Sequence, residues 1–295
     1  MIANSLNIPI TDNHIHIDHI NGLGPVKVAK QFYNVGGRVM MVPNKPSWSF
    51  NTLFKFKKAM DLTISYCDEI NQNTKVKAFP VVGVHPAEFS KLLDSGKSLE
   101  DSYELMKEGL DYGANLVKDQ KAIAIGEIGR PHYEVSTEEM DYQNKILKYG
   151  LKLAKDIDCP VQLHTESASE KQFNEFASFA DEINFNKKKL IKHYSGPYIL
   201  KEENFGLTPS VMSGKDNIKV AISKGDNFLM ETDYLDDLRR PGAVLGLKTV
   251  PKRTLDFIEK EIFTEEDAFK VHKDNVESIY GVNLDWIRIN KLKIE

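Results

Sequence analysis

The sequence predicts an α/β protein built as a (β/α)8 TIM barrel with additional C-terminal helices. Eight short apolar runs typical of β-strands alternate with stretches of helical spacing, and this alternation favours a parallel sheet. Eight strands in 295 residues agree with a closed barrel, a fold that commonly takes ~250 residues. The expected strands are 8–17, 37–43, 76–84, 121–128, 160–165, 189–194, 207–212 and 227–233.

Helical spacing is clearest in three stretches between these runs, 53–72, 137–157 and 169–185. The second is expected to begin at Thr137 as a capping box, with acidic residues in its first turn that favour the positive end of the helix dipole. The segment 198–218 fits either a strand or a loop. Helices near 252–262, 264–272 and 274–281 are expected to cover the outer face of the barrel, so that residues 1–295 form one domain.

Composition and charge narrow the class of protein. A formal net charge of −4 and a pI near 6.1 give no global reason for tight nucleic-acid binding, although a nuclease needs only a locally basic groove. Two cysteines, Cys67 and Cys159, do not make a disulfide framework and favour a reducing compartment. No apolar run approaches the ~18 residues of a membrane span, and the first residues lack the regions of a signal peptide. We therefore expect a soluble, cytoplasmic protein that does not bind membranes.

Several common catalytic signatures are missing from the sequence. It contains no P-loop, no GxGxxG run, no GxSxG elbow and no paired CxxC elements. Nucleotide-cofactor binding, serine hydrolysis and zinc-finger folds therefore have no support.

Six candidate metal ligands recur where the predicted strands end. His14 and His16 close the first apolar run, and alternation along a strand points residues two apart to the same side. The other four each end or directly follow a later strand: Glu127, His164, His193 and Asp233. Barrel enzymes assemble their sites at the carboxyl ends of strands, so the six groups are expected to meet in one pocket and hold two divalent metal ions.

Core packing is the competing explanation for these residues. A single buried histidine is more often a hydrogen-bonded core residue than a ligand, and the His14–His16 pair alone leaves the choice open. Core packing would need a separate explanation for each of the four further ligand-type residues at the equivalent position of other strands. We therefore interpret the six as a metal centre, which indicates a metal-dependent hydrolase that acts through metal-activated water.

The six residues lie in the motifs DNHIHID, AIGEIG, PVQLHTE, IKHYSG and METD, and a further motif, GVHPAE, precedes the second of these. Together, from Thr11 to Tyr234, these motifs resemble the TatD family of metal-dependent hydrolases within the amidohydrolase-like barrels. A weaker echo, NVESIYGV, follows at 275–282. The resemblance implies a (β/α)8 barrel, up to two divalent ions, often zinc or magnesium, and phosphodiester cleavage that includes exonuclease action on DNA.

Position by position, the resemblance assigns His14, His16 and Asp233 to one metal and His164 and His193 to the other. Glu127 would bridge the two, which suits metals ~3.5–4 Å apart that clamp the attacking and leaving oxygens. Glu127 and Asp233 are the expected catalytic residues, and Asp233 is best placed to accept the proton of the attacking water. Zinc, magnesium, manganese and nickel are all candidates, because such ligands accept several metals.

The stretch after the fourth strand departs from the family. Arg130-Pro131-His132-Tyr133 stands where Leu-Asp and aromatic residues are usual. The planar guanidinium of Arg130 has the geometry to bind two phosphate oxygens. The competing explanation is that Arg130 forms a salt bridge or anchors the loop. His132 is a candidate proton donor or outer-shell group, with simple exposure as the alternative, and His85 is a candidate for substrate contact. We expect Arg130, His132 and His85 to bind substrate.

Basic residues also follow the eighth strand, where barrels often build phosphate sites. Arg239, Arg240 and Lys248 are each candidates for contact with a substrate phosphate. Exposed surface charge is the competing explanation for all three.

Two substrate classes are consistent with this site. The first is a phosphodiester, with DNA as the expected partner of a TatD-like deoxyribonuclease. The second is a lactone, ester or amide of a small molecule, because related amidohydrolases use the same ligand geometry on carbonyl groups. A metal-binding scaffold without turnover is a third hypothesis, which the complete ligand set disfavours. No obligate protein partner is expected.

Overall fold

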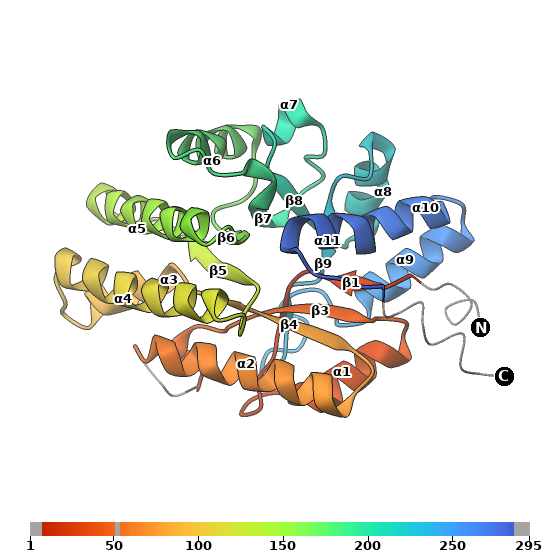
Figure 1. Cartoon of the computed structure of the whole chain (residues 1–295), viewed down its shortest axis with the longest axis horizontal. Helices are drawn as coiled ribbons and strands as arrows, with labels where there is room; N and C mark the ends of the chain where they lie inside the picture. The colour runs from red at the N-terminus through yellow and green to blue at the C-terminus, as the bar shows by residue number, and fades with distance from the viewer. Residues whose placement is uncertain (1–7, 51–53, 286–295) are drawn as a thin grey trace.

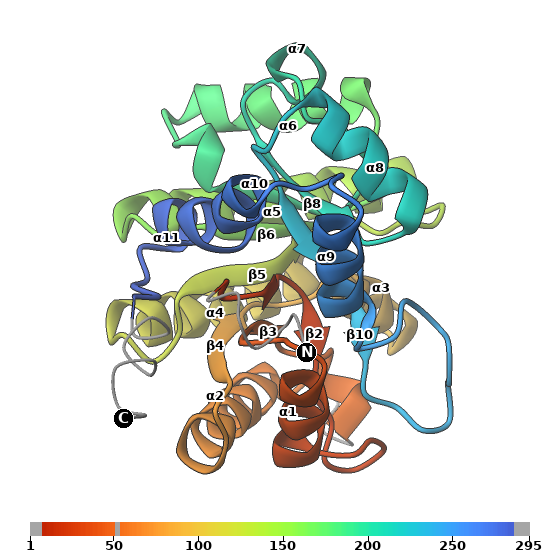
Figure 2. The same ribbon diagram turned by 90° about the vertical axis from the view of Figure 1, so that its right-hand side faces the viewer.

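The computed structural model describes residues 8–50 and 54–285. Eight parallel strands form one sheet in the order β1-β3-β4-β5-β6-β7-β8-β9, and the helices lie around it (Figure 1 and Figure 2). The sheet curls into a nearly closed barrel, because the Asn13 N–H, just after β1, donates to the carbonyl of Met230 in β9 at 2.9 Å. The predicted TIM barrel is confirmed.

The strands follow the predicted runs closely beyond the first. Their bounds are β1 Thr11–Asp12, β2 Ile15–His16, β3 Val39–Pro43, β4 Lys77–Val82, β5 Ala124–Gly129, β6 Val161–His164, β7 Leu190–Ser195, β8 Thr208–Met212, β9 Leu229–Glu231 and β10 Tyr234–Leu235. The segment 198–218 resolves into a short helix, a strand and the start of the next helix.

The longer helices alternate with the strands as predicted. Their bounds are α1 Pro25–Asn34, α2 Phe56–Asn73, α3 Ala87–Asp94, α4 Leu99–Lys118, α5 Thr137–Asp156, α6 Glu170–Glu182, α7 Lys201–Asn204, α8 Lys215–Lys224, α9 Thr249–Glu259, α10 Glu265–Phe269 and α11 Asn275–Tyr280, with short helical turns η2 Ser47–Phe50, η3 Lys187–Lys189 and η4 Lys270–Asp274. Residue 53, the expected start of α2, lies outside the described residues. No helix of the described part of the chain is long and apolar enough to cross a membrane.

The first strand departs from the prediction, because 8–17 forms two short strands instead of one. The Asp12 carboxylate accepts the His14 N–H at 3.2 Å, which interrupts the regular ladder between β1 and β2. β1 pairs with β3 in the barrel, whereas β2 pairs in parallel with β10 in a separate two-stranded sheet. Because Tyr234 lies opposite Ile15 in that sheet, the residue before each, Asp233 and His14, are brought together.

Two smaller predictions also need correction. The side chain that caps α5 is Ser136, whose Oγ accepts the Glu139 N–H at 3.1 Å, while Thr137 is the first residue inside the helix. The last helix, α11, does not lie on the outer face but crosses the amino-terminal end of the barrel, where Val276 and Ile279 pack against the first residues of several strands (Figure 1). Apolar strand starts inside a barrel need such a cover, since they would otherwise face water.

Candidate metal centre

The six predicted ligands meet at the carboxyl-terminal end of the barrel. His16 and His164 are the last residues of β2 and β6, and Asp233 lies between β9 and β10. Asp233 has a φ of 52°, in the left-handed region that a residue with a side chain seldom adopts. The surrounding strands therefore hold it in this conformation, which is characteristic of functional sites.

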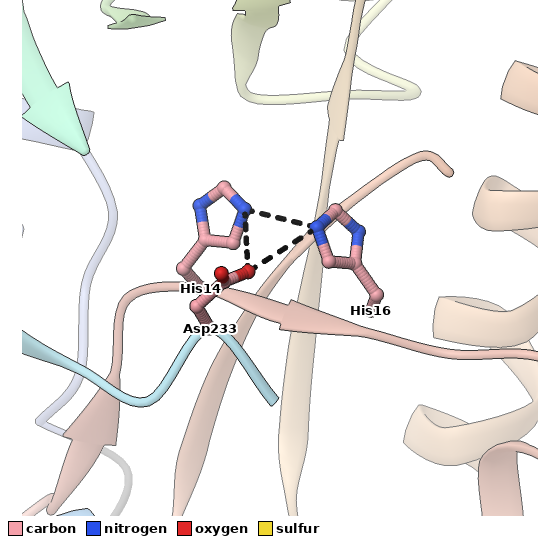
Figure 3. Close-up of side chains that lie close together, drawn as sticks. All are labelled: His14, His16 and Asp233. Carbon is pink, nitrogen blue, oxygen red and sulfur yellow. Dashed lines mark hydrogen bonds and ion pairs between the residues drawn. The ribbon is translucent and has the colours of Figure 1, made fainter. Parts of the chain in front are cut away.

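The first half of the centre consists of four inward-facing groups. The Nε2 atoms of His14 and His16 lie 3.2 Å apart, and each lies close to Asp233 Oδ1, at 3.8 and 3.6 Å (Figure 3). Glu127 Oε2 lies 3.5 Å from the His14 nitrogen and 3.3 Å from the His16 nitrogen. We refer to His14, His16, Glu127 and Asp233 as the first half-site.

The other oxygen of Glu127 faces a second set of histidines. Glu127 Oε1 lies 2.9 Å from His164 Nδ1 and 3.5 Å from His193 Nε2. We refer to Glu127, His164 and His193 as the second half-site. The two half-sites are contiguous, because the rings of His14 and His193 stack with their centres 3.7 Å apart.

These distances fit a divalent cation. Four ligand atoms around a tetrahedral ion at ~2.0–2.1 Å lie roughly 3.3–3.5 Å from one another. The separations of 3.2–3.8 Å in the first half-site match that arrangement. Two uncharged imidazoles facing each other through bare nitrogens would repel unless a proton or a cation lies between them. The Nδ1 atom of His14 is also buried without a hydrogen-bond partner among the described residues.

Protons and metal ions compete for these groups. Burial alone would raise the pKa of Glu127, but His14, His16 and His164 hold that pKa well below its usual range. Burial would lower the pKa of His14, yet Glu127 and the neighbouring carboxylates raise it to about 9. Burial also raises the pKa of Asp233 well above its ordinary value. A bound cation replaces the proton on His14, so metal affinity rises with pH.

Three of the four candidate ligand histidines have a polar atom close to their outer nitrogen. His16 Nδ1 lies 3.2 Å from the carbonyl of Pro43, and His164 Nε2 lies 3.1 Å from His132 Nδ1. His193 Nδ1 lies 2.9 Å from Glu231 Oε1. Partners of this kind fix the tautomer and direction of a ligating imidazole.

Glu231 is a carboxylate beside the centre that the sequence analysis did not single out. It is fully buried, and its pKa is lowered because His193 and Ser210 offset the effect of burial. Its position held a signal, because it precedes Asp233 by two residues at a strand end and so points to the same side. The METD motif therefore supplies one candidate ligand, Asp233, and one carboxylate, Glu231, that contacts the candidate ligand His193.

A chain of side-chain hydrogen bonds runs from Glu231 through the barrel interior. Ser210 Oγ donates to Glu231, and Asn13 Nδ2 donates to Ser210 Oγ at 2.9 Å. The Tyr280 hydroxyl, in α11, donates to Asn13 Oδ1 at 2.7 Å, and Gln162 Nε2 donates to Tyr280 at 2.7 Å. The polar floor beneath the metal centre is thereby connected to the helix that closes the other end.

Arg130 does not reach the cleft. Its buried guanidinium forms paired contacts with the carboxylates of Glu166 and Glu175, including 2.7 Å from Nη1 to Glu175 Oε1, and lies 4.6 Å from the centre of the Phe176 ring. All the donors of its fork are directed at protein partners. The expected phosphate contact is replaced by the salt bridge that was its competing explanation.

His85 and His132 do lie beside the second half-site. The His85 ring centre is 4.2 Å from that of His164, and its Nδ1 accepts the Ala87 N–H at 3.1 Å. Burial holds the pKa of His85 well below its usual value, so this imidazole is neutral near pH 7. His132 is exposed and contacts the outer nitrogen of His164. Both residues are therefore positioned to contact a substrate or to orient His164.

A cleft of about 530 Å³ opens above the centre. Its walls carry all the candidate ligands except His14, together with His85, Trp48, Lys45, Arg239 and Arg240. Lys45 pairs with Asp18 at 2.6 Å and Arg239 with Asp237 at 2.8 Å, whereas the Arg240 side chain has no ion pair among the described residues. Lys248 precedes α9 and is not among the residues described as lining the cleft. Arg240 is thus the basic residue best placed for an incoming anion.

A (β/α)8 barrel whose strand ends gather four histidines and two carboxylates is the architecture of a metal-dependent hydrolase. Comparison with known proteins supports assignment of the chain to a family of hydrolases. The chain belongs to the TatD family, because the family model for TatD related DNase matches residues 11–281.

The chain is also similar to individual proteins, at different levels of sequence identity. It is 46% identical over 280 residues to the uncharacterized protein MJ1127 of Methanocaldococcus jannaschii, covering 95% of this chain and 98% of that one. A deoxyribonuclease of Homo sapiens, TATDN3, is 27% identical over 125 residues, which cover 41% of this chain and 40% of the human protein.

Solved structures show the same fold at low sequence identity. The TatD homologue YJJV of Escherichia coli superposes with a TM-score of 0.60 at 18% identity, over 94% of this chain and all of that chain. A mutant PTE-like lactonase from Deinococcus radiodurans superposes with a TM-score of 0.58 at 13% identity, over 94% of this chain and 97% of that chain. The shared barrel therefore hosts more than one kind of hydrolysis.

Proposed function

We propose that the protein is a phosphodiesterase that uses two divalent metal ions, with DNA as its substrate. The observation that carries this proposal is the position of Glu127, whose two oxygens face two separate sets of ligand nitrogens. A carboxylate placed in this way suits a pair of ions held close together. The match to TatD related DNases and the partial likeness to a human deoxyribonuclease support the choice of DNA.

The side chains have distinct roles in this proposal. His14, His16 and Asp233 would hold one ion, His164 and His193 the other, and Glu127 both. Such ions would supply activation of water and neutralisation of charge on the phosphoryl oxygens. Asp233 accepts the proton of the attacking water, because its carboxylate lies on the cleft wall. Arg240 binds a phosphate oxygen at the cleft mouth, and His85 and His132 contact the substrate beside His164.

Carbonyl hydrolysis of a small lactone, ester or amide is the second candidate. Most cations near the cleft are already paired, since Lys45 contacts Asp18, Arg239 contacts Asp237, and Arg130 is buried among carboxylates. A cleft with so few free cations is less suited to a polyanion than to an uncharged substrate. The structural likeness to a lactonase supports this candidate at the level of the fold.

Metal content and substrate preference test both candidates together. The metal bound to purified protein is measured by mass spectrometry, and hydrolysis of bis-p-nitrophenyl phosphate, lactones and amides is followed after chelation and metal re-addition. Two metal equivalents with metal-restored phosphodiester cleavage support the first candidate, and lactone or amide turnover without phosphodiester cleavage supports the second.

Two variants make the test specific to the site. His164→Ala is expected to fold, to lose metal from the second half-site and to lose activity. His272→Gln, a change at a buried histidine far from the cleft, is the matched control and should keep both. An unchanged rate in His164→Ala would exclude the two-metal mechanism.

A further inference from the structure

A second hollow lies beside the metal cleft at the same end of the barrel. It has a volume of about 600 Å³ and is formed by the ends of β7 and β8 and by segments that follow β6, β7, β8 and β10. Six residues define its character: Tyr194, Pro197, Tyr198, Met212, Asn217 and Leu245. We call it the Tyr194 hollow. None of the predicted ligands or substrate contacts lines it.

The Tyr194 hollow adjoins the metal centre directly. Tyr194 follows the ligand His193, and the two rings lie with their centres 5.9 Å apart in an edge-on arrangement. Leu245, on the other wall, follows Val244, which lines the metal cleft. A molecule bound at the metals therefore needs only a short extension to place a second group in this hollow.

Tyr194 is held in an unusual way for an exposed aromatic residue. Its backbone has a φ of 54°, in the left-handed region, and its side chain is 50% exposed. The Tyr194 N–H donates to Glu231 Oε1 at 2.6 Å, so the same carboxylate that orients His193 also fixes this strained backbone. Strain of this kind persists where the surrounding structure over-determines a residue, often at sites that bind ligands. Here the Tyr194 side chain is one of those that line the hollow.

The chemistry of the walls favours a flat, uncharged group. Two tyrosines, a proline, a methionine and a leucine offer apolar and aromatic faces, and the amide of Asn217 offers both a donor and an acceptor. No carboxylate belongs to the described lining. The one lysine there, Lys224, donates to the carbonyl of Pro197 at 3.0 Å and pairs with Glu203, so its charge is largely neutralised. The hollow therefore suits neither a metal ion nor a second phosphate.

We propose that the Tyr194 hollow binds the base of a nucleotide whose phosphodiester lies at the metal centre. Bases stack on aromatic side chains irrespective of sequence, and an amide can bond to the edge of the ring. The inference rests on the proposed function, since it names the group attached to the scissile phosphate. The protein then reads the substrate as a nucleotide and not as an arbitrary phosphate ester.

Two substrates with the same leaving group isolate this contact. They are p-nitrophenyl thymidine 5′-phosphate, which carries a deoxyribose and a base, and ethyl p-nitrophenyl phosphate, which carries neither. In Tyr194→Ala the ratio of kcat/KM for the nucleoside ester to that for the ethyl ester should fall at least about fivefold, the lower end of the effect of base stacking. Leu245→Trp, which fills the hollow from its other wall, should lower the same ratio. Tyr133→Ala removes an exposed tyrosine outside the hollow and should leave the ratio unchanged.

A binding measurement keeps this inference separate from the proposed reaction. Thymidine should show saturation-transfer NMR signals from its ring protons with native protein and with Tyr133→Ala, and these should be lost in Tyr194→Ala. An unchanged ratio together with unchanged thymidine signals in Tyr194→Ala overturns the inference. An equal loss on both esters also overturns it, because Tyr194 would then act through His193. If thymidine binding depends on Tyr194 but neither ester is hydrolysed, the inference about the hollow is supported and the proposed phosphodiesterase reaction is contradicted.

Discussion

The buried histidines of this protein fall into two groups that differ in how their nitrogens are satisfied. His272 is fully buried in the seam between the C-terminal helices and β1, where its Nδ1 accepts the Thr11 N–H at 3.1 Å and its Nε2 lies 2.7 Å from Thr254 Oγ1. At the metal centre, His14 and His16 turn bare nitrogens toward each other and toward carboxylates. Burial is the same in both places, so burial alone does not distinguish a core histidine from a ligand. The groups that contact the two ring nitrogens distinguish a core histidine from a candidate ligand.

A second difference lies within the centre itself. The first half-site supplies four protein ligands at tetrahedral spacing, as closed metal sites do. The second half-site has Glu127, His164 and His193, and all three line the cleft together with His85. Catalytic sites keep such an open position for water or substrate. We therefore expect the first half-site to hold its metal more tightly and the second to contact the substrate.

Glu127→Gln should have the largest effect, because both half-sites share this side chain. The amide keeps the shape but removes the charge and one acceptor, so both metal equivalents and all metal-dependent hydrolysis should be lost. Mass spectrometry of metal content after dialysis, with circular dichroism to verify the fold, measures this outcome. Retention of two equivalents would mean that the two half-sites do not depend on a shared carboxylate.

Asp233→Asn should separate the half-sites. It weakens the first and leaves the second unchanged, so one metal equivalent should be lost and one retained. Activity should fall roughly 10²- to 10⁴-fold, the range for loss of a group that accepts a proton in the transition state. Metal stoichiometry and kcat are measured on the same sample. Loss of both equivalents would contradict the division into two half-sites.

His132→Phe should have a smaller effect, confined to the second half-site. It removes the partner at 3.1 Å from His164 Nε2 but no ligand. Loss of an outer-shell partner typically weakens metal affinity about 10- to 100-fold. Competition titration with a chelator should show two steps, with only the weaker one shifted. A uniform shift of both steps would place His132 outside this role.

His272→Gln should leave metal binding unchanged and alter only acid stability. Burial lowers the pKa of His272 from 6.5 to about 4, so the unfolded chain binds a proton that the folded chain refuses. Stability is therefore lost as the pH falls from about 6.5 toward 4, and at pH 5 the native protein should lose roughly 2 kcal/mol through this group. Urea unfolding at pH 7.5 and pH 5 measures this loss. It should be smaller by that amount in the variant, and an equal loss in both proteins would contradict the assignment.

The sequence predicted which six side chains the structure brings together, because these residues obey one local rule. Each lies at or near the carboxyl end of a strand, and period-two alternation together with the barrel geometry brings these ends to one place. What could not be predicted depends on distant partners. Arg130 contacts Glu166 and Glu175 only because β5 lies beside β6 and α6. No local sequence pattern predicts that contact.

The division of the first predicted strand is a similar case. It follows from a hydrogen bond that Asp12 makes with its own neighbour and from the pairing of β2 with β10, whose sequences are more than two hundred residues apart. Glu231, by contrast, was within reach of the same alternation rule that identified Asp233. Its omission shows that a carboxylate beside a ligand should be examined as a partner of another ligand.

The bond between Tyr280 and Asn13 joins residues 267 positions apart, and this has a consequence for how the protein is made. Synthesis produces His14 first and Asp233 last among the six ligands, with Tyr280 following only after α9 and α10. When Asp233 has just been synthesised, the nascent chain already carries all six candidate ligands. It still lacks Tyr280, whose hydroxyl bonds to Asn13 in the interior beneath them. The interior beneath the centre is therefore completed only after α11 has been synthesised and can close the barrel.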